Sequence, residues 1–320
     1  MKPTLRLLLF SLLLTSYSVN AQSDYISIYL DKNELECTRK TDAKSIAKIR
    51  LSTERNVLDS VYVYYLDGNI KSKGTYLKYV RGIKHGEMTH YYKNGTLAKK
   101  ETYNKGVLIV EEVEYYPNGQ LKLIKMHPFN SKNVEIKNAW NKEGKQTVLD
   151  GKGVLDYISW DGIHTAKGKV KNGNKVGEWI GKNNLLSFTY TEKYDAHGKL
   201  MSGVSIKNQK EFTYFQLTEE PKHEKGKYHV YRSIAHVIKY PREAKNGEVK
   251  GKVYTRMYIS EKGDAYNFKV VEGIGPRCDK EAFRVISLVF KDANMIPAKT
   301  RGVAFESVYI FPLSFKVGLE

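Results

Sequence analysis

The sequence predicts a β-rich chain in two parts, an array of stacked antiparallel hairpins followed by a small α+β domain with a three-stranded antiparallel sheet. Two observations lead to this prediction. One short phrase, an aromatic residue followed by a glycine, recurs within residues 60–205. Residues 228–320 instead switch between helical and strand periodicity.

The chain begins with a pattern typical of a secretory signal peptide. Residues 1–21 place Lys2 and Arg6 before an apolar run, and the segment ends in small or polar residues up to Ala21. The run from 7 to 14 is shorter than the ~20 residues that span a bilayer. We therefore expect cleavage after Ala21 and an exported protein in the periplasm or cell envelope. The alternative is that residues 1–21 remain as a short, uncleaved anchor.

Residues 22–60 precede the repeats, and we expect them to form a strand or short helix that caps the array, since a repeat array needs a polar cap.

The repeated phrase then occurs five times, as YYLDGNIK (64–71), YYKNGTLA (91–98), YYPNGQLK (115–122), WNKEGKQT (140–147) and YDAHGKLM (194–201). The five glycines are 27, 24, 25 and 54 residues apart, and the last interval is near two periods. A second phrase, G-x-x-x-G-E, occurs at 82–87 and 173–178.

Each phrase predicts a β-hairpin. An Asn-Gly or Asp-Gly pair provides the positive φ of a tight turn, and the flanking Tyr, Trp, Val and Ile favour strands. A hairpin of about 25 residues is too small to bury its own face, so the hairpins are expected to stack into one elongated sheet. The turn glycines are Gly68, Gly95, Gly119, Gly144 and Gly198.

The two phrases together resemble the MORN-repeat variant of YwqK-like proteins, described by Gly-x-x-x-Gly-x-Trp and then Tyr-Tyr-x-x-Gly-x-Leu. The matching positions are Gly177, Trp179, Tyr91, Tyr92, Gly95 and Leu97. The resemblance covers about residues 60–205, with a degenerate unit at 140–147. It implies the fold and assigns no activity.

Residues 206–227 are charged and contain Pro221 and Gly226, a composition that predicts a linker. Beyond it, the apolar spacing predicts a helix over 228–240, strands at 251–260 and 266–273, a helix at 278–290 and a last strand at 302–317. The first helix should end before Pro241, because a residue preceding proline is pushed out of the helical region.

This second part resembles the TonB C-terminal domain over about 228–317. The matching residues are Tyr240-Pro241, Ala244, Gly251-Lys252-Val253, Gly263, Ala282, Pro297-Ala298 and Pro312 to Phe315. Met295 stands where the family usually has Trp, which replaces one large apolar side chain by another.

The resemblance implies a protein partner. TonB C-terminal domains capture a short segment of an outer-membrane receptor as an extra strand, and an unpaired sheet edge provides the physical basis. The implied partner-binding residues are Tyr240, Pro241, Ala304, Phe305, Glu306, Ser307, Val308, Tyr309, Ile310 and Phe311. In the strand Ala304–Phe311, odd-numbered side chains share one face and even-numbered side chains the other.

The sequence argues against an enzyme. It contains no G-x-S-x-G, H-E-x-x-H, P-loop or Rossmann glycine pattern, and its eight histidines lack the spacing of metal ligands. We therefore expect no catalytic residue, no metal site and no cofactor.

The formal charge of +18 is spread along the chain without a nucleic-acid-binding motif. It favours weak contact with an anionic envelope surface over nucleic-acid binding.

Two cysteines, Cys37 and Cys278, would permit a disulfide in an exported chain. Because they lie far apart in the sequence, we expect two separate buried thiols.

Two functions remain open. The first is an exported binding protein, whose C-terminal domain captures an extended peptide and whose repeats contact a second envelope component. The second is a genuine TonB energy transducer with residues 1–21 as its anchor. Transducers of that family carry a functional histidine in the membrane helix and a proline-rich spacer. Residues 1–21 hold no histidine, and the chain has 8 prolines. N-terminal sequencing distinguishes the two, since a mature chain that begins at Gln22 excludes the simple transducer.

Overall fold

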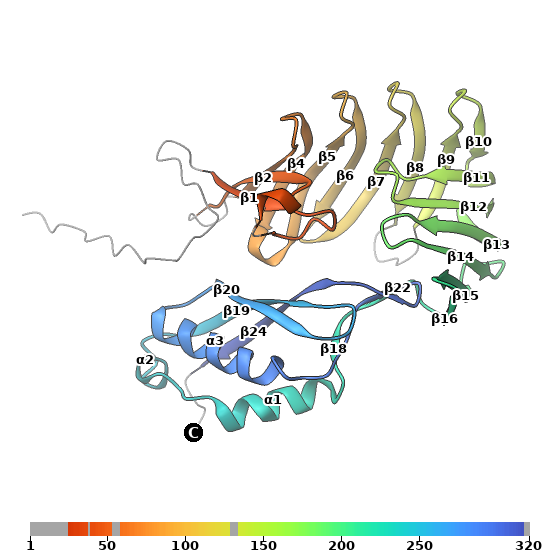
Figure 1. Cartoon of the computed structure of the whole chain (residues 1–320). Coiled ribbons are helices and arrows are strands. Elements are labelled where there is room, and N and C mark those ends of the chain that lie inside the picture. Colours follow the sequence, from red (N-terminus) through yellow and green to blue (C-terminus); the bar gives the residue numbers. More distant parts are fainter. Residues whose placement is uncertain (1–24, 38, 53–57, 129–133, 317–320) are drawn as a thin grey trace, which may run out of the picture. The chain divides into compact units, whose positions relative to one another are not determined.

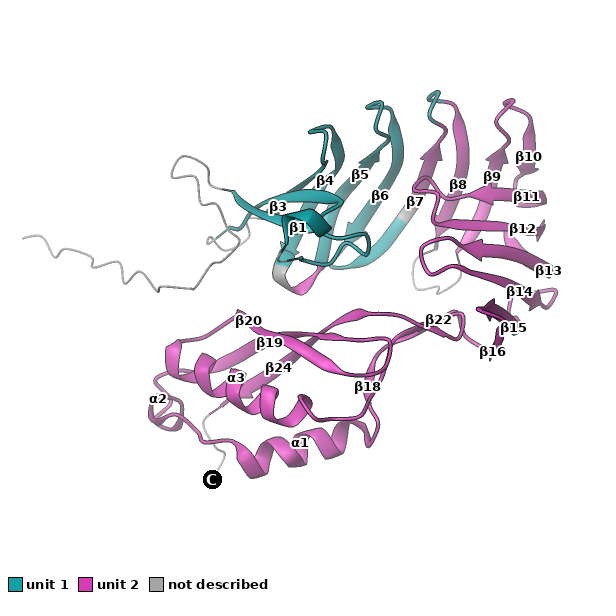
Figure 2. Ribbon diagram, viewed as in Figure 1, with its two compact units in different colours: residues 1–79, 83–109, 117–119 teal, residues 80–82, 110–116, 120–320 magenta. Residues whose placement is uncertain are grey.

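The structure is a computed structural model that describes residues 25–37, 39–52, 58–128 and 134–316 (Figure 1). The expected signal peptide or anchor at 1–21 lies outside these residues. Within the described ranges, no helix is both long and apolar enough to cross a membrane. The chain forms two compact units (Figure 2). The first comprises residues 1–79, 83–109 and 117–119, and the second comprises 80–82, 110–116 and 120–320.

Sixteen strands follow one another in sequence order within one antiparallel sheet. The first eight are β1 (Ile26–Leu30), β2 (Ser45–Arg50), β3 (Asp59–Tyr65), β4 (Ile70–Lys78), β5 (Ile83–Tyr91), β6 (Leu97–Asn104), β7 (Val107–Tyr115) and β8 (Leu121–His127). The next eight are β9 (Glu135–Trp140), β10 (Gln146–Leu149), β11 (Lys152–Ile158), β12 (His164–Lys171), β13 (Asn174–Asn183), β14 (Phe188–Tyr194), β15 (Leu200–Lys207) and β16 (Lys210–Tyr214). The predicted hairpin array is confirmed. The cap consists of β1, β2 and the short 3-10 helix Lys40–Asp42. Its two strands continue the sheet.

The five predicted turn glycines all have positive φ, between 79° and 91°. At Gly95 the turn closes through Gly95 N–H to Tyr92 C=O (2.9 Å) and Tyr92 N–H to Thr96 C=O (2.9 Å). The strand register shifts by one residue beside this turn, between His90 and Tyr91. This is a three-residue hairpin with a glycine bulge, which requires a left-handed residue at the glycine position.

Successive hairpins are joined by hydrogen bonds that span one repeat. In the first unit, Tyr65 Oη donates to Tyr91 C=O (2.8 Å), and Asn69 Nδ2 donates to Lys93 C=O (3.2 Å). In the second unit, Tyr116 Oη donates to Trp140 C=O (2.8 Å). In these two phrases the tyrosine therefore binds the backbone of the next hairpin, which gives a physical reason for its recurrence there.

Strand glycines make room for large side chains on the neighbouring strand. In the second unit, Gly168 is paired with Trp179, Gly181 with Tyr190, and Gly203 with Tyr214. A Cβ built on these glycines would lie 2.3, 2.3 and 2.1 Å from side-chain atoms of those partners, too close for the side chains to stay in place. In the first unit Gly74 and Met88 form the same kind of pair. The aromatic rings thus lie across the backbone of the sheet and cover it.

The stretch 206–227, expected as a linker, is largely paired. It contains β16, β17 (Thr218–Glu219) and β18 (Lys222–His223), and it lies inside the second compact unit. β17 pairs with β22 (Lys299–Thr300), and β18 pairs with β21 (Met295–Ile296). The short strands of this stretch expose charged side chains, although their backbone groups are hydrogen-bonded. Composition alone therefore suggested a linker.

The C-terminal part has the predicted α+β order. Helix α1 spans Gly226–Val237, α2 spans Arg242–Lys245 and α3 spans Pro276–Phe290. The sheet has the order β20 (Ala265–Glu272), β19 (Gly251–Ile259) and β24 (Ser307–Phe315). The two-residue strand β23 (Val303–Ala304) precedes β24. The first helix ends three residues earlier than predicted, since Ile238 is already extended and the short α2 follows Pro241.

Helices α1 and α3 cover one face of this sheet (Figure 1). Their buried residues Ile234, Ala282 and Ile286 join one core with Met257 and Phe315 of the strands. Met295, at the position where the family has Trp, is 5% exposed and belongs to the same core. Both cysteines are free thiols, with Cys278 buried in this core and Cys37 half-buried in the first unit.

Candidate functional site

The open edge of the C-terminal sheet is the first candidate site. β24 lies at one end of the order β20-β19-β24, and among the strands that the structure describes it pairs with β19 alone. The pairing runs from Ile259 opposite Ser307 to Gly251 opposite Phe315. The other side of β24 therefore presents its backbone groups without a partner strand in the described part of the chain.

The side chains of β24 alternate as predicted. Phe311 and Phe315 are 3% and 0% exposed and pack under the helices, whereas Val308 is 40% exposed on the opposite face. The predicted strand Ala304–Phe311 nevertheless has the wrong boundaries. Ala304 belongs to β23, the chain leaves the strand at Phe305 and Glu306, and β24 continues to Phe315. Phe305 N–H donates to Ala298 C=O (3.1 Å), which turns the chain away from β19 at this point.

Tyr240 contacts the end of β24, and Pro241 follows it in the chain. Tyr240 Oη donates to Lys316 C=O (3.1 Å) and accepts from Lys316 N–H (2.9 Å). Its ring meets Phe315 edge to face, with centroids 5.4 Å apart. Pro241 has φ −60° and immediately precedes α2. Tyr240 therefore anchors the C-terminal end of the candidate edge, a role that the sequence pattern alone does not distinguish from direct binding.

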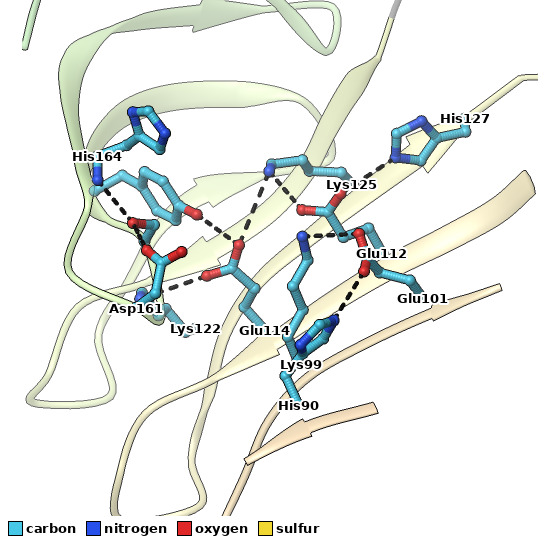
Figure 3. Close-up of polar contacts among 12 residues, drawn as sticks. His90, Lys99, Glu101, Glu112, Glu114, Lys122, Lys125, His127, Asp161 and His164 are labelled. Carbon is cyan, nitrogen blue, oxygen red and sulfur yellow. Dashed lines mark hydrogen bonds and ion pairs between the residues drawn. The ribbon is translucent and has the colours of Figure 1, made fainter. Parts of the chain in front are cut away.

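Charged side chains are buried inside the array, a feature that the sequence analysis missed. In the first unit, Glu101 is 5% exposed and contacts Lys99 Nζ (2.9 Å) and His90 Nε2 (3.2 Å) (Figure 3). Tyr103 Oη also donates to Glu101 (3.2 Å). Burial alone would raise the pKa of Glu101, but its bonds to His90 and Lys99 outweigh burial and lower the pKa to about 2. The carboxylate is therefore fully ionised and compensated.

The lowered pKa of Glu101 predicts a pH dependence of stability. A carboxyl whose pKa is lower in the folded than in the unfolded chain stabilises the fold above the unfolded value near 4.5, and this contribution is lost as the pH falls toward about 2. We expect Glu101→Gln to lower the free energy of unfolding at pH 7 by on the order of 3 kcal/mol. Denaturant titrations at pH 7 and pH 3 measure both proteins. A difference that does not shrink at pH 3 would contradict the ionised, paired state of Glu101.

In the second unit, two more glutamates occupy a similar environment (Figure 3). Lys125 Nζ lies 2.6 Å from Glu112 Oε1, and Tyr157 Oη donates to Glu114 Oε1 at 2.5 Å. Lys122 lies 3.5 Å from Glu114, and burial lowers the pKa of this lysine. Each charge has an opposite charge beside it, which is the condition under which buried ions persist.

A third buried carboxylate, Glu192 of β14, is 0% exposed and lies in a ring of polar contacts. It accepts from Tyr194 Oη (2.8 Å), Tyr214 Oη (3.1 Å) and Arg301 Nε (2.7 Å), and Lys175 Nζ is 3.4 Å away. Burial raises the pKa of Tyr194 and Tyr214, so both hydroxyls remain protonated donors. The described residues contain no cluster of three His, Cys, Asp or Glu side chains that could hold a metal ion.

Two families match parts of the chain. Residues 237–317 match the family model described as Gram-negative bacterial TonB protein C-terminal. Residues 60–78, 84–105 and 109–126 match the model of the MORN repeat variant. The chain carries a TonB C-terminal domain behind MORN-variant repeats. No curated protein matches the chain.

The TonB C-terminal domain indicates a TonB-like, envelope-associated protein. Domains of this family are interaction and energy-transducer modules rather than enzymes, and they bind other proteins such as outer-membrane receptors. The MORN-variant match covers the first three hairpin repeats, and the sheet continues beyond it to Tyr214, with positive φ again at the turn glycines Gly144 and Gly198.

Proposed function

We propose that this protein is an exported component of the cell envelope whose TonB C-terminal domain captures an extended peptide, such as a segment of an outer-membrane receptor, as an added strand. The observation that supports the proposal is the position of β24 at the edge of its sheet, paired with β19 on one side only among the described strands. An unpaired edge of this kind offers a row of N–H and C=O groups to another chain.

The proline in β24 indicates which backbone groups face the incoming strand. In a strand, alternate residues direct their N–H and C=O groups to opposite edges, and a proline within a sheet occurs where its missing N–H faces outward. Pro312 lies opposite Tyr254 of β19. We infer that Val308, Ile310 and Pro312 face the open edge, while Tyr309 and Phe311 bond to β19. A captured peptide then finds N–H donors at Val308 and Ile310, and the ladder of donors stops at Pro312.

The array holds this domain and makes the second envelope contact. Its backbone ladder from hairpin to hairpin and its compensated buried charges provide a stable scaffold. The basic character of the chain favours weak contact with anionic envelope surfaces. The proposal assigns no catalytic residue and no cofactor to any part of the chain.

Hydrogen–deuterium exchange on the mature chain, residues 22–320, tests the proposal. The probe is a set of extended, mainly apolar peptides of about ten residues. Binding by strand addition should slow the exchange of the Val308 and Ile310 amides, because a captured peptide bonds to both. Amides bonded to β19 should change little. Binding that instead slows exchange along β20, or around Tyr240, would show that β24 is not the receiving edge.

A further inference from the structure

A hairpin of the TonB C-terminal domain packs against the last strands of the array, within the second compact unit. Strands β22 and β23 are joined by Arg301 and Gly302, with φ values of 51° and 75°. Two consecutive left-handed residues form a tight two-residue turn, which places Arg301 at the tip of the hairpin. Arg301 N–H donates to Leu217 C=O (2.8 Å), so the tip is also tied to the chain that leaves the array.

The Arg301 side chain contacts two residues of β14, Glu192 and Tyr190. Its Nε donates to Glu192 Oε1 at 2.7 Å, with side-chain exposures of 14% for the arginine and 0% for the glutamate. Its guanidinium carbon lies 4.1 Å from the centroid of the Tyr190 ring. A planar guanidinium can donate to a carboxylate in its plane while its face stacks on an aromatic ring. Tyr214 of the last array strand donates to the same Glu192 oxygen.

Apolar contacts continue from the tip along the hairpin. Val303 is 2% exposed and packs with Phe188 and Tyr190 of β14, and Phe212 of β16 lies beside this cluster. A Cβ on Gly302 would lie 3.2 Å from Phe212 Cβ, so the turn approaches β16 as closely as side-chain packing permits. The hairpin is therefore packed against the array by buried apolar and charged groups together.

We propose that the β22–β23 hairpin locks the TonB C-terminal domain onto the end of the array, with Arg301 and Glu192 as the contact that fixes its orientation. The array then fixes the orientation of the β24 edge. A force applied to a bound peptide is transmitted to the array through the hairpin and through β17 and β18. The lock does not depend on peptide capture, so it can be tested with the unliganded chain.

The decisive variant is Arg301→Gln, which removes the charge and the stacking on Tyr190. The mature chain carries spin labels at cysteines placed at Lys193 and Lys280, two exposed positions on β14 and α3, with Cys37→Ser and Cys278→Ala to remove the native thiols. We expect one narrow distance distribution in the parent and a broad one in Arg301→Gln. Tryptic cleavage at Lys222 and Lys225 should accelerate about tenfold or more, because cleavage follows the population of the open form.

Arg277→Gln is the matched control, since it removes an arginine of α3 that is 74% exposed and pairs with Glu243. It should leave both measurements unchanged. Arg301→Lys keeps the charge, so its distance distribution and its cleavage rate should lie between those of the parent and of Arg301→Gln. If Arg301→Gln does not fold, Arg301→Lys is the variant that tests the lock. A narrow parent-like distribution in a folded Arg301→Gln or Arg301→Lys chain, with unchanged cleavage, would overturn the lock.

Discussion

Replacing Gly168 by valine should destabilise the second unit by about 3–5 kcal/mol, the range for losing a buried tryptophan from a core. A Cβ at this position would lie 2.3 Å from Trp179, whose side chain is 0% exposed. The indole cannot stay where it is, and its Nε1 would lose the hydrogen bond to Lys169 C=O (3.2 Å). The effect is steric alone, since Gly168 does not have a positive φ.

Gly95→Val is the matched comparison, because it isolates the other role of glycine. Gly95 has φ +83° and no atom within 4 Å of a built Cβ, so valine there is strained but not crowded. Its cost should be on the order of 1–3 kcal/mol, and Gly119→Val, with φ +84°, should behave alike. Urea titrations followed by circular dichroism measure all three variants.

A double variant tests the steric explanation directly. If Gly168→Val acts by displacing Trp179, its cost should be much smaller in a Trp179→Ala background, where the space is empty. Equal costs in both backgrounds would show that the valine disturbs the backbone instead of the indole.

The sequence reveals one role of glycine in the array and hides the other. Turn glycines follow Asn, Asp or another polar residue between aromatic runs, and this local pattern predicted Gly68 and Gly95 correctly. Gly168 and Gly203 stand inside strands, where their partners Trp179 and Tyr214 are set by register. Register is decided by pairing across strands, so no local pattern indicates which glycine faces an aromatic ring.

The buried charges were missed for a related reason. Ionised carboxylates usually face solvent, whereas the burial of Glu101 and Glu192 depends on basic side chains such as His90 and Arg301, which come from other elements. Arg301 is 109 residues from Glu192. A signal was nevertheless present, because Arg301-Gly302 lies between two short polar and apolar runs in a form typical of a two-residue hairpin. Recognising it would have shown a hairpin before the last strand, in place of one strand from residue 302.

Val308→Pro should weaken peptide capture by about tenfold to a hundredfold, the effect of an unpaired acceptor on the peptide. If Val308 directs its N–H to the open edge, proline there removes a donor from the incoming strand and leaves the bonds between β24 and β19 intact. Val308→Ala keeps this donor and should bind nearly as the parent does. Ser307→Ala should have a mild effect, since affinity in strand addition comes chiefly from the backbone.

Tyr309→Pro provides the opposite control. Tyr309 pairs with Met257 of β19, so proline at this position should break the ladder and unfold the TonB C-terminal domain. Fluorescence anisotropy of a labelled extended peptide with the mature chain measures capture, and circular dichroism confirms that Val308→Pro remains folded. If folded Val308→Pro binds the peptide as well as the parent does, the edge of β24 is not the receiving surface. The surface around Tyr240 and Pro241, which anchors the end of β24 through Lys316, then becomes the candidate.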